Sequence, residues 1–232
     1  MRQLIESEPF ILIITFVAYW IGLKVDARFH RAITNPLLVA IAVLLPLLVV
    51  LDIDYPTYDS GSHLITFLLG PAVVSLGYNM HLQVKCIKKN LYPILCTIVI
   101  GSLVGVLSII ALCRLFGTDV TVITSLEPKS VTMAIALSLS EHCGGLPALT
   151  AMSVTICGVF GSVIGPWLLR AVGVKSKVAR GLAMGAAAHG TGTARAFEMG
   201  QLEGAVAGMA IGLMGVFTSV FMPLINLLIM NE

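Results

Sequence analysis

The chain has 232 residues, of which 57% are hydrophobic and only 11% are charged, and its formal net charge is +2 at pH 7. A water-soluble protein carries about 25% charged residues, so this chain has too few to cover a water-facing surface of its size. The small net charge gives no indication of nucleic-acid binding. We therefore predict an all-α, polytopic integral membrane protein that forms a single transmembrane domain over residues 1–232 in the lipid bilayer.

Apolar segments follow one another along the whole chain, separated by short polar breaks. A helix that crosses a bilayer needs about 20 mostly apolar residues. The clear candidates for such helices are residues 9–23, 35–51, 62–80, 91–116, 146–171 and 203–230. Two further segments, 120–141 and 180–200, are apolar but interrupted, so we expect about 6–8 transmembrane helices with two broken or re-entrant segments.

Lysine and arginine residues gather in three of the loops between these segments. Cytoplasmic loops of membrane proteins are enriched in these residues, so the three loops are predicted to be cytoplasmic. The basic residues are Lys24, Arg28 and Arg31 in the first loop, Lys85, Lys88 and Lys89 in the second, and Arg170, Lys175, Lys177 and Arg180 in the third. An acidic loop, residues 52–59, precedes the third candidate helix and is predicted to be external, which places the N-terminus outside the cytoplasm.

This orientation constrains the two interrupted segments. Residues 117–145 must begin and end at the external face, so they form either an external loop or a re-entrant hairpin, and their apolar content favours the hairpin. Segment 180–200 begins in the cytoplasm and is either a crossing or a second re-entrant hairpin. A crossing would place the C-terminus inside, whereas a hairpin would place it outside.

The first interrupted segment contains a polar stretch around a proline, residues 125–132. Because proline fits the first turn of a helix and breaks a helix interior, we predict a short helix that begins near Pro128. Free backbone N–H groups at such an end, with the donors of Lys129, Ser130 and Thr132, would bind an anionic group. The alternative is a polar external loop in which Glu127 and Lys129 are solvated.

The second interrupted segment, residues 185–198, combines small residues with three ionisable side chains. Gly190 and Gly192 permit backbone conformations that other residues resist, so residues 189–193 are predicted to be unwound, with a helix resuming after them. Arg195 and Glu198 lie three residues apart and would pair on one helical face. Ionisable residues in apolar membrane sequence indicate a functional site, and the alternative is that this segment lies at the cytoplasmic surface.

Glycine recurs at every fourth position where the final apolar segment begins. The four residues are Gly200, Gly204, Gly208 and Gly212. This spacing places them on one face of a helix, and small residues at this spacing allow membrane helices to pack closely. We predict a helix-packing face, whose partner is another helix of the same chain, a second copy in a homo-oligomer, or a helix bundle that slides against it.

The chain resembles the LrgB/CidB family through its two polar stretches, Ser125-Leu126-Glu127-Pro128-Lys129-Ser130-Val131-Thr132 and His189-Gly190-Thr191-Gly192-Thr193-Ala194-Arg195. The step Leu69-Gly70-Pro71-Ala72 also fits this family, and the resemblance covers essentially the whole chain. One departure is Thr191, where the family more often has isoleucine.

The resemblance implies a multi-pass protein of a bacterial inner membrane, so that the N-terminus predicted from the basic loops would be periplasmic. It also implies two competing functions. Members of the family are named as antiholin-like or holin-like proteins that modulate murein hydrolase export and cell lysis. They are described as acting with a small LrgA/CidA-type membrane partner. Related plastid proteins move glycolate and glycerate, and some bacterial relatives are linked to pyruvate movement.

The residue chemistry favours transport of a small organic anion, since a holin-like lesion does not require internal charged motifs with proline and glycine breaks. We predict a secondary transporter of small monocarboxylates, with proton coupling through His189 or Glu198 as a further hypothesis. The predicted substrate-binding residues are Glu127, Pro128, Lys129, Ser130, Thr132, His189, Gly190, Thr191, Gly192, Thr193 and Arg195. The alternative is a regulator of lysis that acts through its partner. No enzyme, cofactor or metal motif is recognisable, so we expect no enzyme, no cofactor and no metal site.

Overall fold

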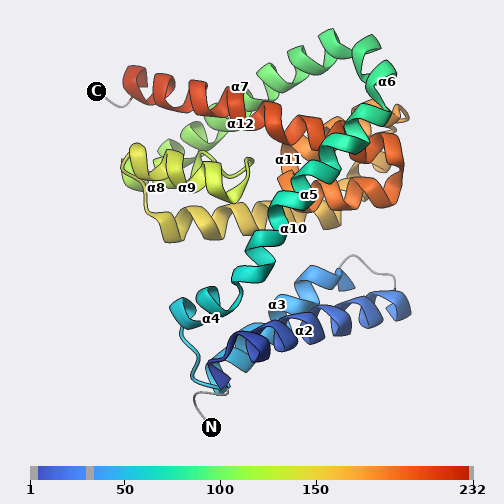
Figure 1. Ribbon diagram of the computed structural model, residues 1–232. Coiled ribbons are helices and arrows are strands. Elements are labelled where there is room, and N and C mark those ends of the chain that lie inside the picture. Colours follow the sequence, from blue (N-terminus) through green and yellow to red (C-terminus); the bar gives the residue numbers. More distant parts are fainter. Residues whose placement is uncertain (1–4, 30–33, 230–232) are drawn as a thin grey trace. The chain divides into compact units, whose positions relative to one another are not determined.

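The computed structural model describes residues 5–29 and 34–229, and its regular elements in those ranges are the α-helices α2 to α12 (Figure 1). No strand occurs in the described part of the chain, which confirms the predicted all-α class. The chain divides into two compact units, residues 1–75 and 76–232. That both belong to one membrane domain stays a prediction. Arg31, predicted in the first basic loop, lies outside the described residues.

Four described helices are long and apolar enough to cross a membrane: α2 (Glu8–Phe29), α7 (Leu91–Leu115), α10 (Pro147–Ala171) and α12 (Gln201–Ile229). A fifth span results if α3 (Pro36–Val50) and α4 (Tyr55–Gly61), which are bent by 119°, form one broken crossing. The described helices therefore support a multi-pass membrane protein but do not confirm a count of 6–8. The third candidate segment forms the helix α5 (His63–Leu82), which continues from the first unit into the second.

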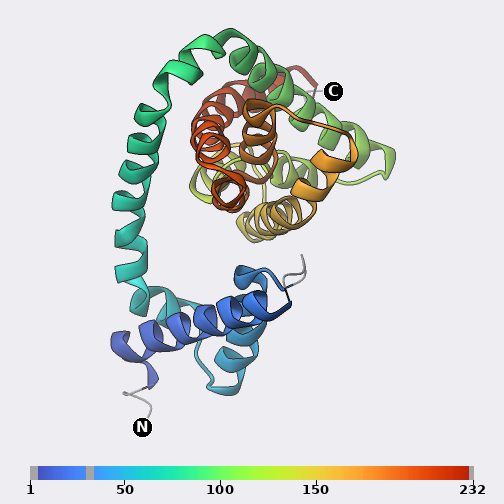
Figure 2. The same ribbon diagram turned by 90° about the vertical axis from the view of Figure 1, so that its right-hand side faces the viewer.

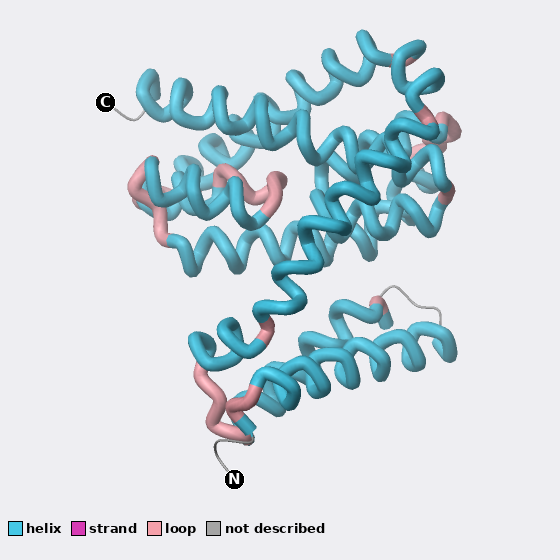
Figure 3. The backbone as a smooth tube through the Cα atoms, in the orientation of Figure 1, coloured by secondary structure: helices cyan, strands magenta, loops and turns pink. Residues whose placement is uncertain are grey.

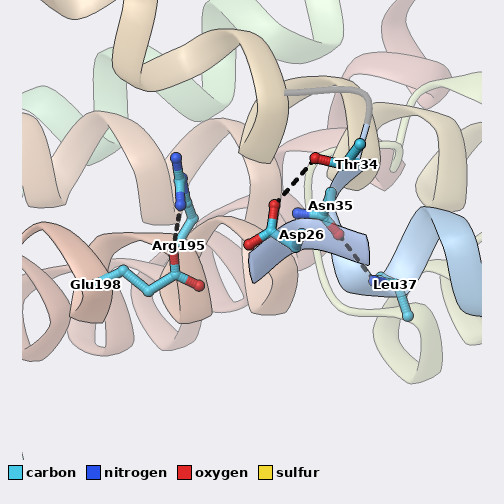
Figure 4. Close-up of polar contacts among 6 residues, drawn as sticks. All are labelled: Asp26, Thr34, Asn35, Leu37, Arg195 and Glu198. Carbon is cyan, nitrogen blue, oxygen red and sulfur yellow. Dashed lines mark hydrogen bonds and ion pairs between the residues drawn. The ribbon is translucent and has the colours of Figure 1, made fainter. Parts of the chain in front are cut away.

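The first unit is built from α2, α3 and α4, with α2 packed against both of the others. Polar contacts fix the start of α3: the Thr34 hydroxyl donates to Asp26 Oδ1 at 3.2 Å, and the Asn35 side chain caps the helix by accepting from the Leu37 N–H at 3.0 Å (Figure 4). Gly22 allows α2 and α3 to approach closely, because a Cβ there would lie 2.3 Å from a backbone oxygen of α3.

The second unit contains the two polar stretches. The segment α11 (Lys177–Met199) consists of two helical parts joined at a kink and packs against both α10 and α12, and α7 packs against α12 (Figures 1 and 2). The short helices α8 (Val120–Leu126) and α9 (Met133–His142) form a hairpin that contacts α10 through both helices. In this hairpin, α8 also contacts α7, and α9 also contacts α12. A further short helix, α6 (Val84–Lys89), precedes α7.

One apolar core joins the helices of this unit. Its buried side chains belong to α6, α7, α9, α10, α11, α12 and the turn before α9, and they are Ile87, Ile94, Ile98, Val131, Ala136, Val154, Leu182, Val206, Met209, Ala210 and Met214. Val131 belongs to the turn between α8 and α9 and is 1% exposed. The polar residues next to it in the sequence are therefore brought to the edge of the core.

The turn between α8 and α9, residues 127–132, shows that the predicted helix start near Pro128 was wrong (Figure 3). Helix α8 continues to Leu126, and α9 begins only at Met133. The reason is that turn hydrogen bonds use the amides which we expected to be free: the N–H of residue 129 donates to Leu126 O, and the N–H of Val131 donates to Pro128 O, both at 3.2 Å. The first polar stretch thus ends one helix and precedes the next.

Candidate functional site

Helix α11 is broken near its middle, as the sequence predicted. Ala188 (φ −128°, ψ 19°) and His189 (φ 39°, ψ −127°) have non-helical backbone angles. The break is shorter than the predicted stretch 189–193, and the positive φ falls on His189 rather than on either glycine. A residue with a Cβ rarely adopts this conformation, and such strain is concentrated at functional sites.

Contacts with α10 hold His189 in this conformation. Its Nε2 lies 3.0 Å from the carbonyl oxygen of Val154, and because a carbonyl only accepts, Nε2 carries the proton and donates. The ring lies over Gly158, where a Cβ would be 2.6 Å from ring atoms Cε1 and Nε2. The side chain is buried, with 8% of its surface exposed. The break is therefore shaped by packing between α10 and α11 as well as by the local sequence.

A cavity of about 270 Å³ lies beside α11 and is lined mainly by charged side chains. Its lining residues are Pro166 and Arg170 of α10 and Arg180, Arg195, Glu198 and Met199 of α11. Three guanidinium groups around one small cavity are suited to a carboxylate or phosphate group, which arginine binds with two parallel hydrogen bonds. We call it the arginine pocket.

Internal ion pairs neutralise two of these arginines. Arg180 donates to Glu203 Oε1 at 2.5 Å, and the acid of this pair is buried, since Glu203 is 1% exposed. Arg195 pairs with Glu198 on the open side of α11, as the spacing predicted (Figure 4). Arg170 donates through Nε to the Pro166 carbonyl at 3.1 Å. Glu198 is the one acidic residue among the lining residues, so the charge of Arg170 is left unbalanced there.

Part of the first polar stretch lines a second, smaller cavity. The carboxylate of Glu127 is 2% exposed and accepts from the Asn226 side chain of α12 at 2.9 Å. Lys129 donates through Nζ to the Ser130 hydroxyl at 3.0 Å. Pro128 is buried. Glu127 and Ser130 line this second cavity, and its lining shares no residue with that of the arginine pocket.

The other predicted binding residues lie just before α9 or just after the break in α11. Thr132 precedes α9 as its N-cap. The Thr191 hydroxyl donates to Ala188 O at 3.0 Å, across the break, and Thr193 is buried with a hydroxyl that has no hydrogen-bond partner within the described residues. Gly190 is exposed, whereas Gly192 is buried. Their roles in binding stay predictions.

Only part of the predicted glycine face of the last helix has close neighbours in the described structure. A Cβ at Gly204 would lie 2.2 Å from the Phe197 ring, and one at Gly200 would lie 2.4 Å from the Glu203 carboxylate. Gly212 faces open space in the described structure, and Gly208 is half-buried. The backbones of two helices come together at Gly181 and Gly185 of α11, where a Cβ would be 2.3 Å from a backbone oxygen of α12.

Sequence reasoning missed several residues of this region. In the sequence, Arg170 and Arg180 indicate only a cytoplasmic loop, yet both line the pocket. Glycines of α10 let α11 pack closely against it, since a Cβ at Gly161 would lie 2.5 Å from Ala188 and one at Gly165 would lie 2.6 Å from Met184. Glu203 was also missed, although an acidic residue inside an apolar segment is a signal that finds such sites.

The fold and the site define a class: a multi-pass α-helical membrane protein with a broken helix beside an arginine-lined pocket. The LrgB-like family profile matches residues 15–228, and the chain belongs to that family. It is 35% identical to YwbG of Bacillus subtilis over 207 aligned residues, and the alignment covers 89% of this chain and 92% of YwbG. It is 34% identical over 216 residues to the antiholin-like protein LrgB of Bacillus cereus, with coverage of 92% and 93%. No solved structure matches this chain.

Proposed function

We propose that the chain is a non-enzymatic secondary transporter that moves small monocarboxylates across a bacterial inner membrane. The observation that carries the proposal is the arginine pocket on the broken helix α11. Transporters of several folds bind substrate where membrane helices are discontinuous, because the break frees backbone groups inside the membrane. Glycolate, glycerate and pyruvate are the substrates suggested by the resemblance to the plastid and bacterial relatives.

The charge and size of the arginine pocket support a small monoanion. Two of its three arginines are already neutralised by Glu203 and Glu198, so the charge of Arg170 remains for the substrate. A volume of about 270 Å³ is just below the range of drug-sized small-molecule sites, roughly 300–1,000 Å³, and suits an acid of few carbon atoms. Arg195 is exposed enough to exchange its bond with Glu198 for a bond with a carboxylate.

The two polar stretches supply the remaining parts of the proposal. In it, Lys129, Ser130 and Thr132 act at the external side of the membrane, and the arginine pocket opens on the cytoplasmic side, as the positive-inside tendency suggests. The two polar stretches would then lie at two ends of one route, used alternately. Glu198 and His189 remain candidates for proton coupling.

Uptake of labelled glycolate, glycerate and pyruvate into proteoliposomes that hold the purified protein tests this proposal. Wild type should give saturable uptake of at least one acid, and Lys129→Ala and Arg195→Ala should each abolish it. Lys177→Ala is the matched control, because Lys177 is an exposed basic residue of α11 outside the pocket lining. Absence of saturable uptake for all three acids, with and without a small LrgA/CidA-type partner, contradicts transport.

A second candidate function is antiholin-like control of murein hydrolase export and cell lysis, together with such a partner. The names of relatives support it more directly than they support transport, since the Bacillus cereus relative is named an antiholin-like protein and the relatives reported above have no name that mentions a transported molecule. Autolysis of cells that express wild type or Arg195→Ala separates the two functions. An effect on lysis that survives the loss of uptake favours the regulator, and an effect lost together with uptake favours the transporter.

A further inference from the structure

Glu127 is a buried carboxylate of which only one oxygen accepts a hydrogen bond within the described residues. Its Oε2 accepts from Asn226 Nδ2 at 2.9 Å, whereas its Oε1 is buried without a hydrogen-bond partner among the described residues. The Asn226 Oδ1 is buried in the same way. A buried carboxylate without a donor for one of its oxygens is costly, so such a group in a native protein indicates an unseen ion, proton or water.

A small cavity lies next to this carboxylate, and four of its eight lining residues carry side-chain oxygen atoms. The hydroxyl residues Ser102 of α7, Ser130 of the turn and Thr218 of α12 line it together with Glu127. Ser102 and Thr218 are 1% and 3% exposed, so the cavity is enclosed by helices on at least two sides. Its volume of about 10 Å³ is close to the least that holds one water molecule. Carboxylate and hydroxyl oxygens are the ligands that hard cations prefer.

The other polar groups beside Glu127 leave its charge uncompensated in this structure. The Lys129 ammonium is two residues away but donates to the Ser130 hydroxyl, and no bond joins it to Glu127 Oε1. The Cys143 thiol lies beside Asn226 and Glu127, and burial raises its pKa, so it is neutral near pH 7. A single positive charge would neutralise the carboxylate, whereas the nearby Lys129 opposes a divalent ion.

We propose that the cavity beside Glu127 binds one small monovalent cation, a proton or a sodium ion, that neutralises the carboxylate. In the transport cycle, this cation would drive uptake of the anion, a role that rests on the proposed function. Neutralising Glu127 would remove a negative charge that lies two residues from Lys129 and repels an anion there, so cation and anion would bind cooperatively. The binding itself needs no transport and is testable without it.

Thermal unfolding of the purified full-length protein in detergent tests cation binding directly. A ligand that binds only the folded state raises the unfolding midpoint, so the midpoint of wild type should depend on the cation. The sodium arm exchanges choline chloride for sodium chloride at constant ionic strength, and the proton arm varies pH without sodium. Glu127→Gln should lose the response that wild type shows. Glu141→Gln, an exposed acid of α9, is the matched control and should keep it.

A response in the sodium arm that Glu127→Gln removes identifies sodium. A pH response that Glu127→Gln reduces, with no response to sodium, identifies the proton. Identical responses of wild type and Glu127→Gln in both arms overturn the proposal. Asn226→Asp is a second variant that adds an acid beside Glu127, and it should strengthen the response of wild type; an unchanged response contradicts the site. Because no substrate is present, failure of transport in proteoliposomes leaves this result standing, and the two proposals fail separately.

Discussion

Replacing His189 by glycine or by alanine tests the break in α11, on which the account of the site depends. The residue has φ 39° and ψ −127°, a conformation that is strained for any residue with a Cβ and relaxed for glycine. Alanine keeps the strain, which costs on the order of 1–3 kcal/mol, and glycine removes it. Both variants lose the Nε2 bond to Val154 O, worth about 1 kcal/mol, so this loss cancels when they are compared.

The test is which of the two variants has the larger free energy of unfolding. We expect His189→Gly to be more stable than His189→Ala by about 1–3 kcal/mol. In a regular helix the order would be reversed, because glycine is about 1 kcal/mol less favourable than alanine. The assay is equilibrium unfolding in mixed micelles by a denaturing detergent, followed by circular dichroism. Ala187→Gly, at an exposed helical position two residues before, is the control and should destabilise the protein. Equal stability of the two His189 variants, or greater stability of alanine, refutes the strained break.

Three other substitutions test packing and charge in the same unit. Gly185→Ala places a methyl group 2.3 Å from a backbone oxygen of α12 and should lower the free energy of unfolding by about 1–3 kcal/mol in the same assay. Arg180→Ala leaves the buried Glu203 carboxylate unpaired and should cost about 3–5 kcal/mol, much of which a second change, Glu203→Gln, should restore. Arg170→Ala should weaken binding of a labelled monocarboxylate by about tenfold, which is 1.4 kcal/mol, whereas Lys177→Ala should leave it unchanged.

The membrane character and the helical class could be predicted because they depend on bulk composition, which local context does not alter. The break in α11 was also predictable, since glycines inside an apolar segment mark it. That His189 takes the unusual backbone angles was not, because its hydrogen bond to Val154 and the space over Gly158 come from α10. Contacts between segments distant in the sequence leave no local pattern.

The turn at residues 127–132 illustrates a second limit. Pro128 is compatible with the first turn of a helix, so the local rule was sound, yet α9 begins only at Met133. Ser125 is held at the end of α8 because its hydroxyl accepts from the N–H of Leu146 at 2.7 Å. In the same way, Arg170 carried a topology signal in the sequence, and its place in the pocket follows only from the packing of α10 on α11.

Substrate exchange in proteoliposomes tests the central claim, that this chain transports small monocarboxylates through the arginine pocket, most directly. Vesicles preloaded with unlabelled pyruvate, glycolate or glycerate are mixed with a trace of the same labelled acid, with the same sodium concentration and pH on both sides, so that exchange needs no gradient. The account predicts that label enters faster through wild type and Lys177→Ala than through protein-free vesicles, and that Arg170→Ala slows its entry about tenfold. Label entry through wild type at the rate of protein-free vesicles, for all three acids, would contradict it.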